Sequence, residues 1–189
     1  MPKKAILLLA DGFEEVEAIT PVDYLRRAGI EVCTAAIGSG REVRGSHGIP
    51  VTADLILGDL LRQDKIPSWD GVLLPGGMPG AANLAASAET GSFLKAMAAG
   101  DKWVCAICAS PAVVLSPLGL LKGRRFTCFP GMETQVSGAH WQEEPVVVDG
   151  NIITSRAAGT AAAWALTIIA KLAGDGAAKK IASSVLLSD

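Results

Sequence analysis

Short, almost wholly apolar runs recur along this chain, and each is followed by a turn and then by a segment with helical spacing. Three of these runs have the length of a strand: Lys4–Leu9, Gly71–Leu74 and Lys102–Ile107. A strand that is apolar on both sides needs cover on both faces of its sheet, and alternating helices supply that cover. The pattern therefore predicts a mostly parallel sheet between two layers of helices.

The rest of the chain continues this alternation. We expect a further strand at 30–37 and helical segments at 14–28, 80–99, 109–116, 159–172 and 176–187. An Asp-Gly pair between two apolar runs is typical of a tight turn, so we predict a β-hairpin over 146–154. No internal repeat and no long linker divides the sequence. We therefore predict a single domain over residues 1–189, folded as a flavodoxin-like three-layer αβα sandwich.

The composition excludes several classes of protein. Half of the 189 residues are hydrophobic, and 17 Lys and Arg against 19 Asp and Glu give a net charge of −2. Binding to nucleic acid or to an anionic membrane needs a concentrated basic face, so neither partner is expected. The apolar run at 5–10 is too short to cross a membrane or to act as an export signal. We therefore expect a cytoplasmic protein with four reduced cysteines.

Residues suited to chemistry follow three of the predicted strands. Glu17 comes shortly after the first apolar run, Gly76 and Gly77 follow the run at 71–74, and Cys108 follows the run at 102–107. In an open α/β sheet, ligands bind beyond the carboxyl ends of the strands, where the strand order reverses. If these strands are parallel, the four residues converge in one crevice.

Cys108 lies at a predicted strand-to-helix elbow. A nucleophile on such an elbow needs small neighbours because the backbone bends sharply there, and Ala106 and Ala109 are small. The start of a helix also favours the thiolate. A buried free cysteine can equally be a plain core residue, but the elbow leads us to interpret Cys108 as a reactive thiol.

The other cysteines are interpreted as core residues. Cys105 forms a C-x-x-C motif with Cys108, but an offset of three along a strand places the side chains on opposite faces. Their Cα atoms would then lie about 10 Å apart, too far for a disulfide. We interpret Cys33 and Cys128 in the same way as Cys105.

The glycines and Glu17 each allow two readings. Gly76 and Gly77 either form a simple turn or let the amides of Gly77 and Ala109 make an anion or oxyanion pocket. Glu17 is either an ordinary acid near a helix start or an inward-facing partner of Cys108. If it faces the thiol, an ionised Glu17 raises the thiol pKa, whereas a protonated Glu17 can donate to the thiolate. The expected pair is then a thiolate beside a neutral acid.

The chain has two histidines, and neither is assigned a definite role. His140 is either a general base near Cys108 or a surface residue, and His47 suits a loop or an interface. No pair of His or Cys residues has the spacing of a zinc site, and no nucleotide-binding glycine motif occurs. We therefore expect no metal and no cofactor.

These motifs together resemble the ThiJ/PfpI superfamily, and within it the parkinsonism-associated deglycase branch that includes the bacterial YajL-type proteins. The matching stretches occur in family order over nearly the whole chain: Gly12–Glu17, Pro21–Gly29, Val72–Gly77, Ala106–Pro111, and Thr154–Arg156 with Gly159 and Thr160.

The resemblance implies a homodimer with the class I glutamine-amidotransferase-like variant of the flavodoxin fold. It implies that Cys108 is the nucleophile, assisted by a protonated Glu17. It also implies glyoxalase or deglycase activity on methylglyoxal or glycated adducts, without a cofactor. The alternative is an oxidative-stress sensor or chaperone-like protein in which Cys108 is oxidised to sulfinate. Arg27, His140, and His47 acting across the dimer are possible accessory residues.

Three positions depart from the family pattern. Ala109 stands where the protease-like branch has a histidine directly after the nucleophile, which argues against a peptidase. Phe129 stands where some deglycase members have a histidine, so Glu17 is left as the main proton donor. His47 stands where an arginine is common, which implies weaker anion affinity.

Overall fold

The computed structural model describes residues 2–62 and 68–187. A seven-stranded sheet has the order β10-β11-β7-β6-β1-β2-β5, and every neighbouring pair is parallel except β10 with β11. Its strands are β1 (Lys4–Leu9), β2 (Glu31–Ala36), β5 (Leu55–Ile56), β6 (Gly71–Leu74), β7 (Trp103–Ile107), β10 (Val146–Asp149) and β11 (Ile152–Ser155). The mostly parallel sheet predicted from the apolar runs is therefore confirmed.

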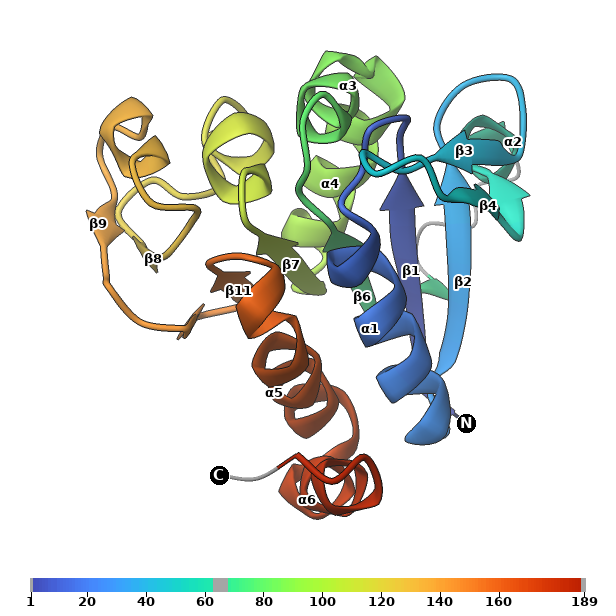
Figure 1. The fold of residues 1–189 in the computed structure, drawn as a ribbon. Coiled ribbons are helices and arrows are strands. Elements are labelled where there is room, and N and C mark those ends of the chain that lie inside the picture. The colour runs from blue at the N-terminus through green and yellow to red at the C-terminus, as the bar shows by residue number, and fades with distance from the viewer. Residues whose placement is uncertain (1, 63–67, 188–189) are drawn as a thin grey trace.

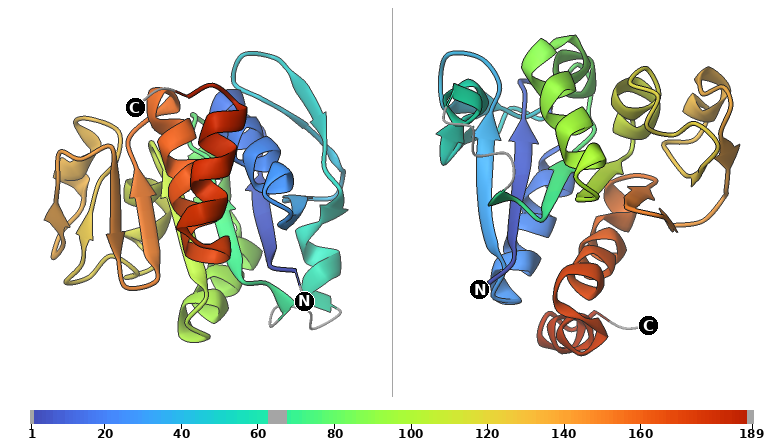
Figure 2. Two further views of the ribbon diagram at one scale, coloured as in Figure 1. Left: turned by 90° about the horizontal axis from the view of Figure 1, so that it is seen from below. Right: turned by 180° about the vertical axis from the view of Figure 1, so that it is seen from behind.

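Helices cover both faces of the sheet. They are α1 (Glu15–Arg27), α2 (Leu57–Arg62), α3 (Gly80–Ala86), α4 (Ala88–Ala99), α5 (Ala161–Ala173) and α6 (Asp175–Ser184). Figure 1 shows α1 and α5 in front of the sheet, and the reverse view in Figure 2 brings α3 and α4 to the front. This is the flavodoxin-like three-layer arrangement that the sequence predicts.

Strand β1 shows why its residues are apolar without alternation. Ile6 and Leu8 pack into the core shared with α3 and α4, whereas Leu7 and Leu9 pack into the core shared with α1 and α5. All four side chains are fully buried. Because both faces of the strand lie inside the protein, polar residues find no place on it.

Two of the predicted helical segments differ in detail from a continuous α-helix. The helical material predicted over 80–99 is confirmed, and it is divided at Ser87, whose hydroxyl accepts a hydrogen bond from the Thr90 amide at 3.2 Å and caps α4. The helix predicted over 109–116 is a single π-helical segment, η2 (Pro111–Leu115). An extra residue per turn of this kind is often found beside functional sites.

Several short elements lie outside these predictions. β3 (Glu42–Arg44) and β4 (Pro50–Thr52) form an antiparallel hairpin, and β8 (Arg125–Phe126) pairs in parallel with β9 (His140–Trp141). Two 3₁₀ segments, η3 (Met132–Gln135) and η4 (Ala158–Thr160), complete the described elements. Figure 1 shows β8 and β9 at the side of the molecule away from β2.

The topology places the predicted chemistry at one edge of the sheet. β1, β6 and β7 are adjacent and parallel, so their carboxyl ends lie side by side. From β1 the chain winds outward to β2, whereas from β6 it winds the other way to β7 and β11. The strand order therefore reverses between β6 and β1, where ligands bind in open α/β sheets. Among the described helices, none has the length and apolarity required to span a bilayer.

Candidate active site

Cys108 follows β7 in a backbone conformation that few non-glycine residues adopt. Its φ is +63°, in the left-handed region. Its amide donates to the Ser155 carbonyl at 3.0 Å, and its carbonyl accepts from the Phe129 amide at 2.8 Å. A conformation of this kind persists only where the surroundings hold it, and such residues cluster at functional sites. The sharp elbow predicted at Cys108 is confirmed.

Glu17 points into the protein from the first part of α1. Only 1% of the residue is exposed, and its Oε2 accepts from the Gly76 amide at 2.8 Å. Its carboxyl group is also hydrogen-bonded to the Cys108 thiol. The start of α1 is held in place because the Glu14 amide donates to the Gly76 carbonyl at 3.0 Å. The structure therefore selects the inward-facing reading of Glu17.

Gly76 allows the thiol and the acid to meet. A Cβ atom added to it would lie 2.6 Å from Cys108 Cβ, 2.8 Å from Glu17 Oε2 and 3.0 Å from the Ala109 nitrogen. No larger residue fits between these groups. The amides of Gly77 and Ala109 are both hydrogen-bonded to the Cys108 sulfur, so the predicted pair of amides does converge on one point.

Burial controls the protonation of the pair. It raises the pKa of the Glu17 carboxyl to about 7, although hydrogen bonds from Gly76 and Cys108 act in the opposite direction. Burial, reinforced by the Glu17 charge, also raises the pKa of the Cys108 thiol to about 12, against the lowering effect of the Gly77 and Ala109 amides. The two groups titrate as a coupled pair, and burial favours the neutral form of each.

Burial opposes the thiolate that we expected at the start of a helix. The helical segment that follows Cys108 is η2, which has five residues and begins three residues after it. A single turn at that distance contributes little dipole, and desolvation of the sulfur outweighs it.

Arg27 and His140, two of the accessory residues named from the resemblance, contact residues other than Cys108 and Glu17. Arg27 is in the last turn of α1, roughly 15 Å along the helix from Glu17, where its Nε donates to Asp23 at 2.7 Å. His140 is exposed on β9, and the position of its strand is fixed by pairing with Arg125. Phe129 is 45% exposed and is joined to the site through its backbone.

The other three cysteines are free thiols. Cys105 and Cys128 are buried, as expected for core residues, and Cys33 is half-buried at the margin of the core. Burial raises the pKa of Cys128 to about 12, and it raises that of Cys33 as well. None of these environments favours a reactive thiolate.

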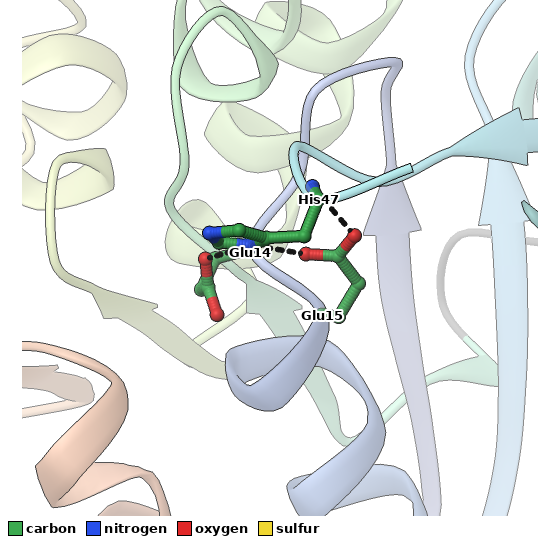
Figure 3. A group of neighbouring side chains, drawn as sticks. All are labelled: Glu14, Glu15 and His47. Atoms are coloured by element: carbon green, nitrogen blue, oxygen red, sulfur yellow. Dashed lines mark hydrogen bonds and ion pairs between the residues drawn. The ribbon is translucent and has the colours of Figure 1, made fainter. Parts of the chain in front are cut away.

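His47 lies on the β3–β4 connection and contacts two carboxylates at the start of α1 (Figure 3). Its Nδ1 is 2.8 Å from Glu15 Oε2 and 3.3 Å from Glu14 Oε2. Sequence reasoning missed this group because the two segments are more than thirty residues apart. It also missed Ser110, whose hydroxyl donates to the Pro75 carbonyl at 2.6 Å and ties the elbow to the glycine turn.

Comparison with known proteins places this geometry in context. Residues 3–171 match the model of the DJ-1/PfpI family. Protein DJ-1 homolog B of Arabidopsis thaliana is 42% identical over 88% of the chain, but the chain spans only 37% of that longer relative. Protein dj-1beta of Drosophila melanogaster is 37% identical over 100% of this chain and 99% of its own. A Pyrococcus abyssi protein named as a deglycase is 35% identical over 85% of this chain and 94% of its own.

Solved structures show the same fold. An oxidised form of Toxoplasma gondii DJ-1 superposes with a TM-score of 0.94 at 37% identity, covering 99% of this chain and 100% of the other. Drosophila melanogaster DJ-1beta gives a TM-score of 0.94 at 36% identity, with 100% of both chains covered. The likeness therefore extends over the whole central sheet and the helices on both of its faces.

Proposed function

The chain belongs to the DJ-1/PfpI family, and on that basis we propose that it is a cysteine-dependent glyoxalase or deglycase acting on methylglyoxal or glycated adducts. The observation that carries the proposal is the buried contact between Glu17 and the Cys108 thiol, with two backbone amides at the sulfur. A thiol, a proton acceptor and an oxyanion pocket are the groups that addition to an aldehyde requires.

The first step is addition of the Cys108 sulfur to the aldehyde carbon. A carbon–sulfur bond forms, the carbonyl π electrons move to oxygen, and the thiol proton passes to ionised Glu17. This transfer creates the pair of sulfur nucleophile and protonated Glu17 implied by the family resemblance. The amides of Gly77 and Ala109 stabilise the new oxyanion, and Glu17 then returns the proton to give a hemithioacetal.

With methylglyoxal the hemithioacetal can rearrange without an external oxidant. Glu17 removes the proton from the carbon attached to sulfur and the neighbouring carbon receives a proton, so that one carbon is oxidised and the other is reduced. The product is a lactoyl thioester on Cys108. Water then cleaves the carbon–sulfur bond, which releases lactate and restores the thiol.

Turnover of methylglyoxal tests the proposal. We expect wild-type protein to produce lactate and Cys108→Ser to lose this activity, because a serine hydroxyl is a much weaker nucleophile at neutral pH. Cys33→Ser, which changes a half-buried thiol outside the site, is the matched control and should retain activity. Full turnover by Cys108→Ser would show that the mechanism is wrong.

The second candidate function is sensing of oxidative stress, with or without chaperone-like activity. The solved structure of the oxidised Toxoplasma relative motivates it. Two equivalents of peroxide would oxidise Cys108 through sulfenate to sulfinate, releasing two waters, and a protonated Glu17 would donate to a sulfinate oxygen. Intact mass after mild peroxide should rise by two oxygens confined to Cys108. Oxidation scattered over other cysteines or methionines would count against this function.

We also propose that two copies of the chain associate through α1. Val16 and Ile19 lie one helical turn apart and are 47% and 45% exposed, and Ile49, whose amide donates to Glu15, is 55% exposed. Light scattering should give the mass of a dimer. Ile19→Glu should yield a monomer, whereas Leu186→Glu, at an exposed position near the other end of the chain, should remain dimeric.

A further inference from the structure

Four polar side-chain atoms from two distant segments converge beside the start of α1. Glu14 and Glu15 come from the turn into α1, and Ser46 and His47 come from the β3–β4 connection. Figure 3 shows the His47 ring lying between the two carboxylates. The donor atoms of Glu14, Glu15 and His47 all lie within 4.8 Å of one another. We call these four residues the Glu-Ser-His cluster.

The separations within the cluster match those between the ligands of a small tetrahedral ion. Ser46 Oγ lies 3.3 Å from Glu14 Oε2, 3.3 Å from Glu15 Oε2 and 3.2 Å from His47 Nδ1. His47 Nδ1 lies 3.3 Å from Glu14 Oε2 and 2.8 Å from Glu15 Oε2. Ligand bonds of about 2.0–2.1 Å in a tetrahedron place neighbouring ligand atoms about 3.3 Å apart. Four of the six edges, at 3.2–3.3 Å, are therefore close to the required length, and the edge between His47 Nδ1 and Glu15 Oε2 is shorter at 2.8 Å.

The charges also favour a divalent cation. Two carboxylates face one imidazole and one hydroxyl, and a singly protonated His47 would balance only one of the two negative charges. Among residues 2–62 and 68–187, neither Glu14 nor Glu15 forms an ion pair with a lysine or arginine. A divalent ion beside a neutral imidazole would balance both carboxylates.

The backbone holds the carboxylates in place. Glu15 Oε1 accepts from the amides of His47 at 2.8 Å and Ile49 at 3.4 Å, which leaves Oε2 directed at the cluster. Gly45 provides the room for this carboxyl group, because an added Cβ would collide with it. Glu14 is anchored through its amide to Gly76. Supported ligands of this kind are characteristic of metal sites.

We propose that the Glu-Ser-His cluster binds a divalent transition-metal ion of the zinc class. Glu14 Oε2, Glu15 Oε2 and His47 Nδ1 are the charged and nitrogen ligands, and Ser46 Oγ occupies the fourth corner. The nitrogen donor and the short separations suit zinc rather than calcium or magnesium, which prefer oxygen ligands in larger or octahedral sets. The ion would tie the β3–β4 hairpin to the start of α1.

This inference revises the expectation that the chain has no metal site. That expectation considered only pairs of His or Cys residues close in sequence, whereas the ligands here come from two separate segments. The site does not include Cys108 or Glu17, although the charge of Glu14 contributes to the raised pKa of Glu17. The test can therefore be carried out on protein that lacks the reactive thiol.

Metal binding should be measured in a Cys108→Ser background, with Zn²⁺ and Co²⁺ as probes. We expect one Zn²⁺ per chain by competition with a chromophoric chelator. Bound Co²⁺ should show the visible bands of a tetrahedral site without thiolate-to-cobalt charge transfer. Loss of an outer-shell partner alone costs 10–100-fold in metal affinity, so His47→Ala and Glu14→Gln should each lower the affinity at least about tenfold.

Matched controls separate this site from adventitious binding. His140→Ala removes the other histidine, and Glu143→Gln removes an exposed carboxylate elsewhere; both should bind Zn²⁺ as the parent does. Zn²⁺ should also raise the unfolding temperature of the parent but not of His47→Ala. Equal affinity in the parent and in His47→Ala, or thiolate charge transfer that disappears only with a cysteine variant, would overturn the proposal.

Discussion

The Gly76 amide donates a hydrogen bond of 2.8 Å to the Glu17 carboxylate, across 59 positions of the sequence. This single contact joins the turn after β6 to the first turn of α1. It also leaves the other side of the carboxyl group free to meet the Cys108 thiol. The pairing of acid and sulfur therefore depends on a residue that has no side chain.

Replacing Gly76 with alanine should abolish methylglyoxal turnover. The new Cβ would overlap Cys108 Cβ and Glu17 Oε2, and overpacking of this kind also costs about 1–3 kcal/mol of unfolding free energy. Gly71→Ala is the matched control, because a Cβ there meets Trp103 only at an ordinary 3.5 Å. Activity and denaturant unfolding should be measured on both. An active Gly76→Ala would show that the close approach is not required.

The pH dependence of kcat/KM should report the Glu17 titration. Ionised Glu17 accepts the thiol proton, and burial holds its pKa at about 7, so activity should rise with pH through about 7. Glu17→Gln retains an acceptor for the Gly76 amide but cannot take a proton. It should lower kcat by about 10²–10⁴-fold and remove the inflection. An unchanged inflection in Glu17→Gln would assign it to another group.

Glu17 should destabilise the fold at neutral and higher pH. The pKa of the Glu17 carboxyl is about 7 in the folded protein, whereas a glutamate freely exposed to water has a pKa of 4.5. The folded state therefore binds more protons than the unfolded state, and the free energy of unfolding falls as pH rises from about 4.5 to 7. The loss reaches about 3 kcal/mol at pH 8. Glu17→Gln should therefore unfold at higher denaturant concentration at pH 8 but not at pH 4. Equal stability at pH 8 would contradict the raised pKa.

Ser87→Ala should destabilise the protein by about 1 kcal/mol. The Ser87 hydroxyl caps α4 by accepting from the Thr90 amide, which otherwise lacks a partner in the first turn. Ser92→Ala, on an exposed face of the same helix, should leave the unfolding free energy within about 0.5 kcal/mol. If the unfolding free energies of the two variants differ by less than about 0.5 kcal/mol, the hydrogen bond of the cap does not contribute measurably to stability.

The parts of the fold that follow from local pattern were predictable. β1 and β6 have the bounds expected from their apolar runs. Both faces of these strands are buried, so polar residues are excluded from the strand and return where it ends. The meeting of Glu17 and Cys108 followed from strand order. The β3–β4 hairpin was missed because its strands have only three residues each, too few to show a hydrophobic period.

The protonation states of Cys108 and Glu17 were harder to predict from the sequence than their positions in the fold. The motif around Cys108 suggested a helix dipole acting on the sulfur, whereas the dominant effect is the depth at which Cys108 and Glu17 lie together. Desolvation depends on how deeply the folded chain buries the two groups, which no local spacing reveals. The contact between His47 and Glu15 has the same origin, because it joins segments that meet only in the folded chain.

The two backbone contacts of Cys108 have a consequence for synthesis on the ribosome. Its carbonyl is held by Phe129 and its amide by Ser155, and both residues are translated after the cysteine. A nascent polypeptide that has emerged only as far as residue 120 lacks both of these hydrogen-bond partners. The complete set of backbone contacts at the elbow can therefore form only after Ser155 has been translated.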